Sequence, residues 1–135
     1  MKIRPFVSLQ FTKTRHLICR ARINNVCANL LIDTGASNSC INSNLRENFQ
    51  LQIEGDSFDA AGANQEKMEA FMTRKCELRL GRHDLGKLGF ILLDLTHVNR
   101  TLCNQGAKPI EGILGADFFK KNKTIIDYCS LKLWL

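Results

Sequence analysis

The chain has 135 residues, of which 44% are hydrophobic and 24% charged, and its formal net charge at pH 7 is +6. This length suits one modest core, so we expect residues 1–135 to form a single domain. A basic charge is compatible with nucleic-acid binding, but basic and aromatic residues are not interleaved as in a stacking surface, so we do not expect a nucleic-acid partner.

The sequence shows no targeting or metal-binding signal. Met1–Pro5 is followed by mixed residues rather than an apolar run, and no stretch has the length of a membrane span, so we expect a cytoplasmic protein without membrane association. The six cysteines contain no Cys-x-x-Cys pair and the three histidines lie far apart. We therefore expect no metal and no cofactor, with most cysteines serving as small buried hydrophobes.

The N-terminal part predicts a strand over residues 5–11 and then a hairpin. Partial alternation of apolar residues marks a strand over 17–23, and residues 26–32 form its partner. Asn24 and Asn25 between them suit a two-residue turn, because asparagine tolerates positive φ.

The second strand of this hairpin runs into an unusual loop. Residues 30–32 are aliphatic and lead directly into Asp33. A carboxylate at the end of a buried strand is costly unless neighbouring groups compensate or use it. Gly35 allows a sharp turn, and the hydroxyls of Thr34 and Ser37 can hydrogen-bond within the loop. The ordinary alternative is a turn aspartate that caps a loop after a strand.

A long hairpin is predicted in the middle of the chain. Residues 51–58 read as a strand, 59–65 form a tract of small residues, and 66–80 alternate as one long strand. The tract is either an ordinary exposed turn or a flap that folds over a ligand, because small residues allow close backbone approach.

The remaining elements predict a mostly β chain with two short helices. The second helix includes Asp117 in its first turn, where a negative charge suits the helix dipole. In chain order these elements are a helix from Asn42 or Ser43 to Phe49, a turn at 81–84, a strand at 88–93, a surface loop at 94–108, a short strand at Ile113 and Leu114 ended by Gly115, the second helix, and a hairpin of 124–127 with 130–135.

Several of these segments together resemble one family. Residues 32–37 (Ile-Asp-Thr-Gly-Ala-Ser) resemble the catalytic loop of aspartic proteases, and residues 113–117 (Ile-Leu-Gly-Ala-Asp) resemble the second signature of that family. The tract at 60–63 lies between them, where the family has its flap, and residues 126–128 resemble the retropepsin-like branch. The order and spacing agree over roughly residues 15 to 135, with only one Asp-Thr-Gly motif.

The resemblance implies a mostly β, single-lobe retropepsin-like closed β-barrel with a flap hairpin and one or two short helices. It also implies a homodimeric aspartic endopeptidase that acts on polypeptide, with Asp33 of each subunit activating a water. The alternative is a retropepsin-like dimerisation or peptide-binding module without turnover, since a fold does not fix a function.

The resemblance also assigns roles to single residues. Thr34 would bond across the two catalytic loops, the Gly35 carbonyl would reach the substrate, and Ser37 would help hold the carboxylate. Residues 130–135 could contribute to the dimer sheet. The other implied positions are Ala36 in the catalytic loop, Ala60, Ala61, Gly62 and Ala63 in the flap, Ile113, Leu114, Gly115 and Asp117 as support behind the loop, and Ala36 with Ile113 in substrate subsites.

Overall fold

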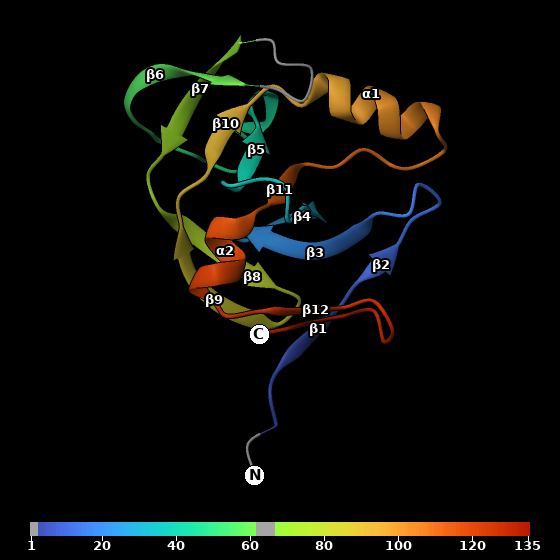
Figure 1. Ribbon diagram of the computed structural model, residues 1–135. Coiled ribbons are helices and arrows are strands. Elements are labelled where there is room, and N and C mark those ends of the chain that lie inside the picture. The colour runs from blue at the N-terminus through green and yellow to red at the C-terminus, as the bar shows by residue number, and fades with distance from the viewer. Residues whose placement is uncertain (1–2, 62–66) are drawn as a thin grey trace.

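The computed structural model describes residues 3–61 and 67–135, and this part of the chain is mostly β (Figure 1). It contains the helices α1 (Thr96–Asn104) and α2 (Ala116–Lys121) and the 3-10 turn η1 (Ser43–Leu45). Its strands are β1 (Phe6–Ser8), β2 (Gln10–Phe11), β3 (Leu17–Ile23), β4 (Val26–Ile32), β5 (Cys40–Asn42), β6 (Ile53–Ala61), β7 (Lys67–Thr73), β8 (Cys76–Leu80), β9 (His83–Leu88), β10 (Ile91–Leu93), β11 (Gly112–Leu114), β12 (Ile125–Asp127) and β13 (Lys132–Trp134).

A large sheet forms the body of the molecule. Its strand order is β6-β7-β10-β5-β11-β4-β3-β8-β9, with β2 paired to β3 at one side. The predicted mostly β fold is thus confirmed, but the sheet does not close. Within the described residues no ladder joins β6 to β9, and Figure 1 shows β6 near the top of the molecule and β9 in its lower half. The expected barrel is therefore a strongly curved open sheet.

The predicted hairpin of β3 and β4 is confirmed, including its turn. Ile23 pairs with Val26, and the intervening Asn24 and Asn25 have φ values of 48° and 67°. Positive φ at both turn residues matches the right-handed twist of the flanking strands. The hairpin fixes the register of β4 and so the position of the residue that follows it.

Strand β11 inserts between two segments that are distant in sequence. It pairs parallel to β4, with Ile113 beside Leu31, and antiparallel to β5. Gly112 is required at its start, because a Cβ atom there would lie 2.5 Å from the Cys40 carbonyl oxygen. This crossing buries the short strand predicted at Ile113 and Leu114 and brings the two signature segments together.

Two apolar clusters lie on the two faces of the sheet. The larger cluster includes the fully buried Phe49, Phe90 and Phe118. The smaller cluster packs helix α1 against the face of the sheet that carries Leu31 and Ile113. Among the described residues no helix has the length and apolarity to cross a membrane.

The chain ends form a separate three-stranded sheet in the order β1-β13-β12. The C-terminal hairpin is confirmed, but β13 is the central strand, with Trp134 beside Phe6 on one side and Ile125 on the other. The backbone of β13 is therefore already paired on both edges within one chain. Interleaving of residues 130–135 with a second chain would require this sheet to open.

Five local predictions are wrong. The strand expected at 5–11 is divided between the two sheets as β1 and β2. The strand expected at 88–93 is interrupted at Gly89 and Phe90, and β9 begins at His83, within the turn expected at 81–84. The loop expected at 94–108 contains α1, and the N-cap Leu95 with Val98 and Leu102 of the helix follows helical spacing. The long strand expected over 66–80 is broken, because β7 and β8 pair with different partners on either side of the break. Asn42 does cap the next turn, but that turn is the three-residue η1 rather than a helix reaching Phe49.

Candidate active site

Asp33 lies directly after β4, and its backbone continues the pairing with β11. The Asp33 N–H donates to the Leu114 carbonyl oxygen at 3.0 Å. Its side-chain Oδ1 accepts a hydrogen bond from the Gly35 N–H at 2.9 Å, and its carbonyl oxygen accepts one from the Ala36 N–H at 3.2 Å. The half-buried carboxylate is thus held in one orientation by its own loop.

A buried network supports this loop from behind. Asp117 Oδ1 accepts hydrogen bonds from the Ser39 N–H at 3.0 Å, the Ser39 hydroxyl at 2.7 Å and the Phe118 N–H at 2.8 Å. The Ser39 Oγ in turn accepts from the Gly115 N–H at 3.0 Å. The network joins the end of the Asp33 loop to the beginning of α2.

Backbone bonds make the same connection. The Ala116 N–H donates to the Ala36 carbonyl oxygen at 2.8 Å, and the Asp117 N–H donates to the Ser37 carbonyl oxygen at 3.2 Å. These contacts place the residues around β11 behind the Asp33 loop, as a support that leaves the carboxylate side of the loop free.

We predict that Ser39→Ala destabilises the fold by about 1–3 kcal/mol, because it removes the partner of a buried backbone N–H and one of the donors to Asp117. Ser39 is fully buried. Urea unfolding followed by fluorescence of Trp134 measures the change. The exposed Ser57→Ala is the matched control, for which we expect less than about 0.5 kcal/mol. Equal unfolding free energies for Ser39→Ala and wild type would contradict this role of the hydroxyl.

A groove of about 850 Å³ opens beside Asp33. The Asp33 loop forms one side of the groove, the strands β6 and β7 form another, and β10 with α1 forms the remaining wall. Its lining consists of Asp33, Gly35, Ala36, Ser37, Asn38, Cys40, Phe58, Ala60, Met68, Ile91, Leu93, Asp94, Leu95, His97, Val98, Thr101 and Ile113.

Six of the thirteen predicted site residues line this groove. They are Asp33, Gly35, Ala36, Ser37, Ala60 and Ile113. The residues Leu114, Gly115 and Asp117 lie behind the loop, as described above, and Thr34 is exposed within it. The Ser37 hydroxyl accepts a hydrogen bond from the Asn38 Nδ2 at 3.3 Å and so differs from its expected role beside the carboxylate.

The predicted flap is a hairpin of β6 and β7. Asp59 pairs with Glu69, Ala60 with Met68 and Ala61 with Lys67, and the ladder is interrupted between Glu54 and Phe58. Gly62 and Ala63, predicted at the flap tip, lie outside the described residues. The hairpin thus places Phe58, Ala60 and Met68 over the groove.

Two sets of residues were missed by the sequence interpretation. Ser39 looks like any loop serine in the sequence, and its role depends on Asp117, which is far along the chain. The groove wall of Asp94, His97, Val98 and Thr101 was hidden by reading this segment as a loop. The spacing of Leu95, Val98 and Leu102 was the signal that could have revealed it.

Cys40 is the cysteine that lines the groove, and its environment argues against a nucleophilic role. Burial, assisted by the negative charges of Asp33 and Asp117, raises the pKa of the Cys40 thiol to about 12. A thiol in this state remains protonated at neutral pH and is a poor nucleophile. In the described part of the chain no three His, Cys, Asp or Glu side chains gather as metal ligands.

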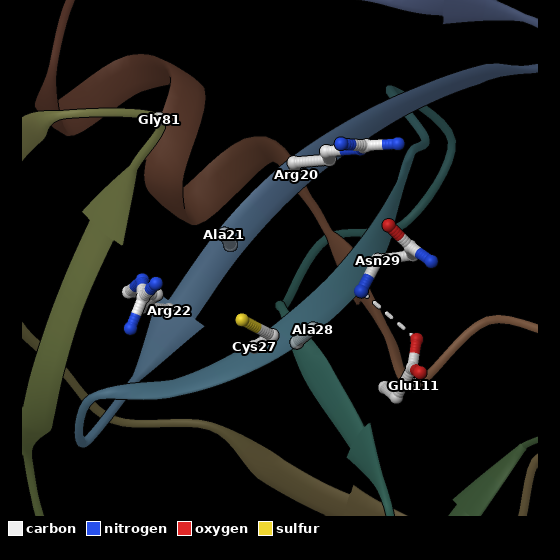
Figure 2. A pocket seen from close by; sticks show the side chains of 8 residues that line it. All are labelled: Arg20, Ala21, Arg22, Cys27, Ala28, Asn29, Gly81 and Glu111. Carbon is white, nitrogen blue, oxygen red and sulfur yellow. Dashed lines mark hydrogen bonds between the residues drawn. The ribbon is translucent and has the colours of Figure 1, made fainter.

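A second, smaller hollow of about 430 Å³ lies on the outer side of the β3–β4 hairpin (Figure 2). Exposed Arg20 and Arg22 of β3 border it, and the Glu111 Oε2 accepts a hydrogen bond from the Asn29 N–H at 2.8 Å. It shares no lining residue with the groove at Asp33. The carboxylate in this hollow, that of Glu111, is bonded to the backbone of Asn29, so the groove at Asp33 is the better candidate for an active site.

The fold is that of the retropepsin-like aspartic proteases. Residues 19–121 match the family described as "gag-polyprotein putative aspartyl protease", and the chain belongs to this family. The match includes both the Asp33 loop and the segment of β11 and α2 behind it. A search of curated proteins found no match.

Solved structures agree with this fold. A retropepsin-like aspartic protease from Rickettsia conorii aligns with a TM-score of 0.60 and 14% identity, over 98% of this chain and 93% of that one. The retroviral protease-like domain of Ddi1 from Leishmania major gives 0.59 and 16%, over 89% and 94%. EIAV protease, solved with the inhibitor HBY-793, gives 0.57 and 18%, over 84% and 94%. At these identities the likeness concerns the fold.

Proposed function

We propose that this protein is a homodimeric aspartic endopeptidase in which Asp33 of each of two subunits forms the catalytic pair. The observation that carries the proposal is the rigidly held carboxylate of Asp33 at the side of a groove, in a chain of an aspartic protease family. A capping aspartate alone would account for the bond to Gly35, but not for the groove or for the buried support behind the loop.

The need for a second subunit follows from the chemistry. General acid/base hydrolysis of a peptide requires one group that accepts a proton from water and one that donates a proton to the substrate. The chain has a single Asp-Thr-Gly motif. The other aspartate that lines the groove is Asp94, which lies before α1 rather than after β4. Its Oδ1 already accepts hydrogen bonds from the backbone N–H and the hydroxyl of Thr96.

In the proposed reaction two Asp33 carboxylates lie about 3 Å apart and share one proton. The charged carboxylate accepts a proton from a water held between them as the water oxygen attacks the peptide carbon. The protonated carboxyl donates its proton to the carbonyl oxygen. Collapse of the tetrahedral intermediate then breaks the C–N bond. The carboxyl that took the proton of the water donates it to the leaving nitrogen, and the other carboxylate takes a proton back from a hydroxyl of the intermediate, with no covalent enzyme intermediate.

The surrounding residues have supporting roles in this proposal. Exposed Thr34 is available to bond the loop of the second subunit, and the Gly35 carbonyl faces the substrate. Ala36 and Ile113 line subsites. The network of Asp117 and Ser39 keeps the loop from shifting, and such precise placement is worth large factors in rate.

The substrate class follows from the shape of the groove. It is open and flanked by the hairpin of β6 and β7, whose backbone can pair with an extended chain as an added strand. We therefore propose unstructured or locally unfolded polypeptide as the substrate.

Cleavage of an unfolded polypeptide between mildly acidic and neutral pH tests the proposal. Because two chains form one site, the activity per chain should rise with protein concentration until dimers predominate. New peptide ends, counted by mass spectrometry, give the rate, and sedimentation gives the dimer fraction. Dimers without cleavage under any condition would instead support a peptide-binding or dimerisation module, and activity per chain independent of dilution would exclude the shared site.

A further inference from the structure

The groove differs in charge from the rest of the molecule. The chain carries 19 Lys and Arg residues against 13 Asp and Glu, and its net charge is +6. Yet among the described residues that line the groove there is no lysine or arginine. The acidic side chains that line the groove are Asp33 and Asp94, and the imidazole of His97 lines it as well. A negative groove on a positive protein favours cationic groups inside the groove.

Asp94 is fixed at the rim by the residue two positions later. Its Oδ1 accepts hydrogen bonds from the Thr96 N–H at 2.9 Å and from the Thr96 hydroxyl at 2.5 Å. These bonds lower the pKa of the exposed Asp94 carboxyl, with a smaller contribution from the charge of His97. The carboxylate is therefore negatively charged throughout the mildly acidic to neutral range.

The groove wall beside Asp94 is apolar. Leu93 and Ile91 of β10 and Val98 of α1 are half-buried, and Ile113 lies in the same apolar cluster. A long side chain that lies on this wall buries methylene groups, while its end reaches the rim. Lysine and arginine have this form, since they pack an aliphatic stem on apolar surface and keep a charged head in water.

We propose that Asp94 is a specificity-determining residue, which favours substrates with a lysine or arginine side chain in the subsite formed by β10 and the first turn of α1. This inference rests on the proposed function, because it concerns the substrate of the same groove. It adds a chemical class to that substrate: extended polypeptide with a basic residue close to the cleaved bond.

Digestion of a library of unstructured peptides tests this inference. Wild type, Asp94→Asn and Asp84→Asn are compared, and the residues around each cleaved bond are counted by mass spectrometry. Asparagine keeps the oxygen that accepts from Thr96 and removes only the charge. Asp84 is the matched control, because it is exposed, accepts from the Gly86 N–H at 2.8 Å in the same way, and lies outside the groove lining.

Wild type and Asp84→Asn should show basic residues enriched at one position, and Asp94→Asn should lower that enrichment about two- to fivefold, as befits a solvent-exposed ion pair. Peptides with norleucine there should be cleaved equally by all three proteins. The enrichment by wild type should also fall between about 0.05 and 0.5 M salt, a readout that needs no variant.

The outcomes separate the two proposals. Cleavage by wild type without basic enrichment, or enrichment that survives in Asp94→Asn or in high salt, overturns the role of Asp94 and leaves the protease assignment intact. Failure of wild type to cleave any peptide overturns the proposed function, and with it this inference. If Asp94→Asn has the same midpoint of thermal unfolding as wild type, the comparison is made between folded proteins.

Discussion

An Asp33→Asn variant is expected to lose peptide cleavage by on the order of a thousandfold or more, while its fold stays intact. Between mildly acidic and neutral pH, an amide can neither accept a proton from water nor donate one to the substrate carbonyl. The Asn Oδ1 can still accept the hydrogen bond that the Gly35 N–H makes to Asp33 at 2.9 Å. Initial rates on an unfolded polypeptide, with urea unfolding of both proteins, measure the two effects.

Mixing the variant with wild type gives a sharper test of the shared site. With a large excess of Asp33→Asn chains, most wild-type chains enter mixed dimers that contain one Asp33 and cannot supply both proton transfers. The activity per wild-type chain should then fall in proportion to the mixed fraction. Activity that remains constant in the mixture, or an Asp33→Asn protein that cleaves like wild type, would show that one chain carries the whole site.

The sequence predicted the fold best where the signal was local. The turn at Asn24 and Asn25 and the strand leading to Asp33 depend on neighbours a few residues away, and both have the predicted form. The short strand at Ile113 was predictable because its pattern matches a family signature. Pairing of this strand with β4, by contrast, is a contact between distant segments. The resemblance implied only that residues 113–117 lie behind the Asp33 loop.

The errors arose where tertiary contacts decide the outcome. Alternation runs through residues 66–80, yet the strand is interrupted at Arg74 and Lys75. The reason is that β7 pairs with β6 in the flap hairpin, whereas β8 pairs with β3. Helix α1 was missed because polar residues dominate its sequence, although its own Leu102 is buried. The consequence is functional, since α1 forms one wall of the groove.

Ser39 and the open sheet show a different limit. Nothing near Ser39 in the sequence indicates a bond to Asp117, a residue 78 positions away. Closure of the sheet depends on how far curvature brings β6 toward β9, which no local pattern encodes. The central position of β13 likewise depends on both chain ends meeting. Of these three features, the Ser39 bond bears directly on how the Asp33 loop is held.

A Gly115→Ala substitution is expected to lower the free energy of unfolding by about 2–4 kcal/mol. The φ of Gly115 is −113°, so backbone strain is not the cause. The added Cβ atom would lie 2.6 Å from the Ala36 carbonyl oxygen and 3.0 Å from backbone atoms of Asn38. Those backbone atoms belong to the Asp33 loop, which must move away to admit a methyl group.

The displacement should also lower the cleavage rate of the protein that remains folded, because the carbonyl of Ala36 is the acceptor for the Ala116 N–H. Gly89→Ala is the matched control, since a Cβ there would meet the Thr73 carbonyl oxygen at an ordinary 3.4 Å. Urea unfolding monitored by Trp134 and rates corrected for the folded fraction check both variants. If Gly115→Ala were as stable and as active as Gly89→Ala, the close packing behind the Asp33 loop would not be what fixes its carboxylate.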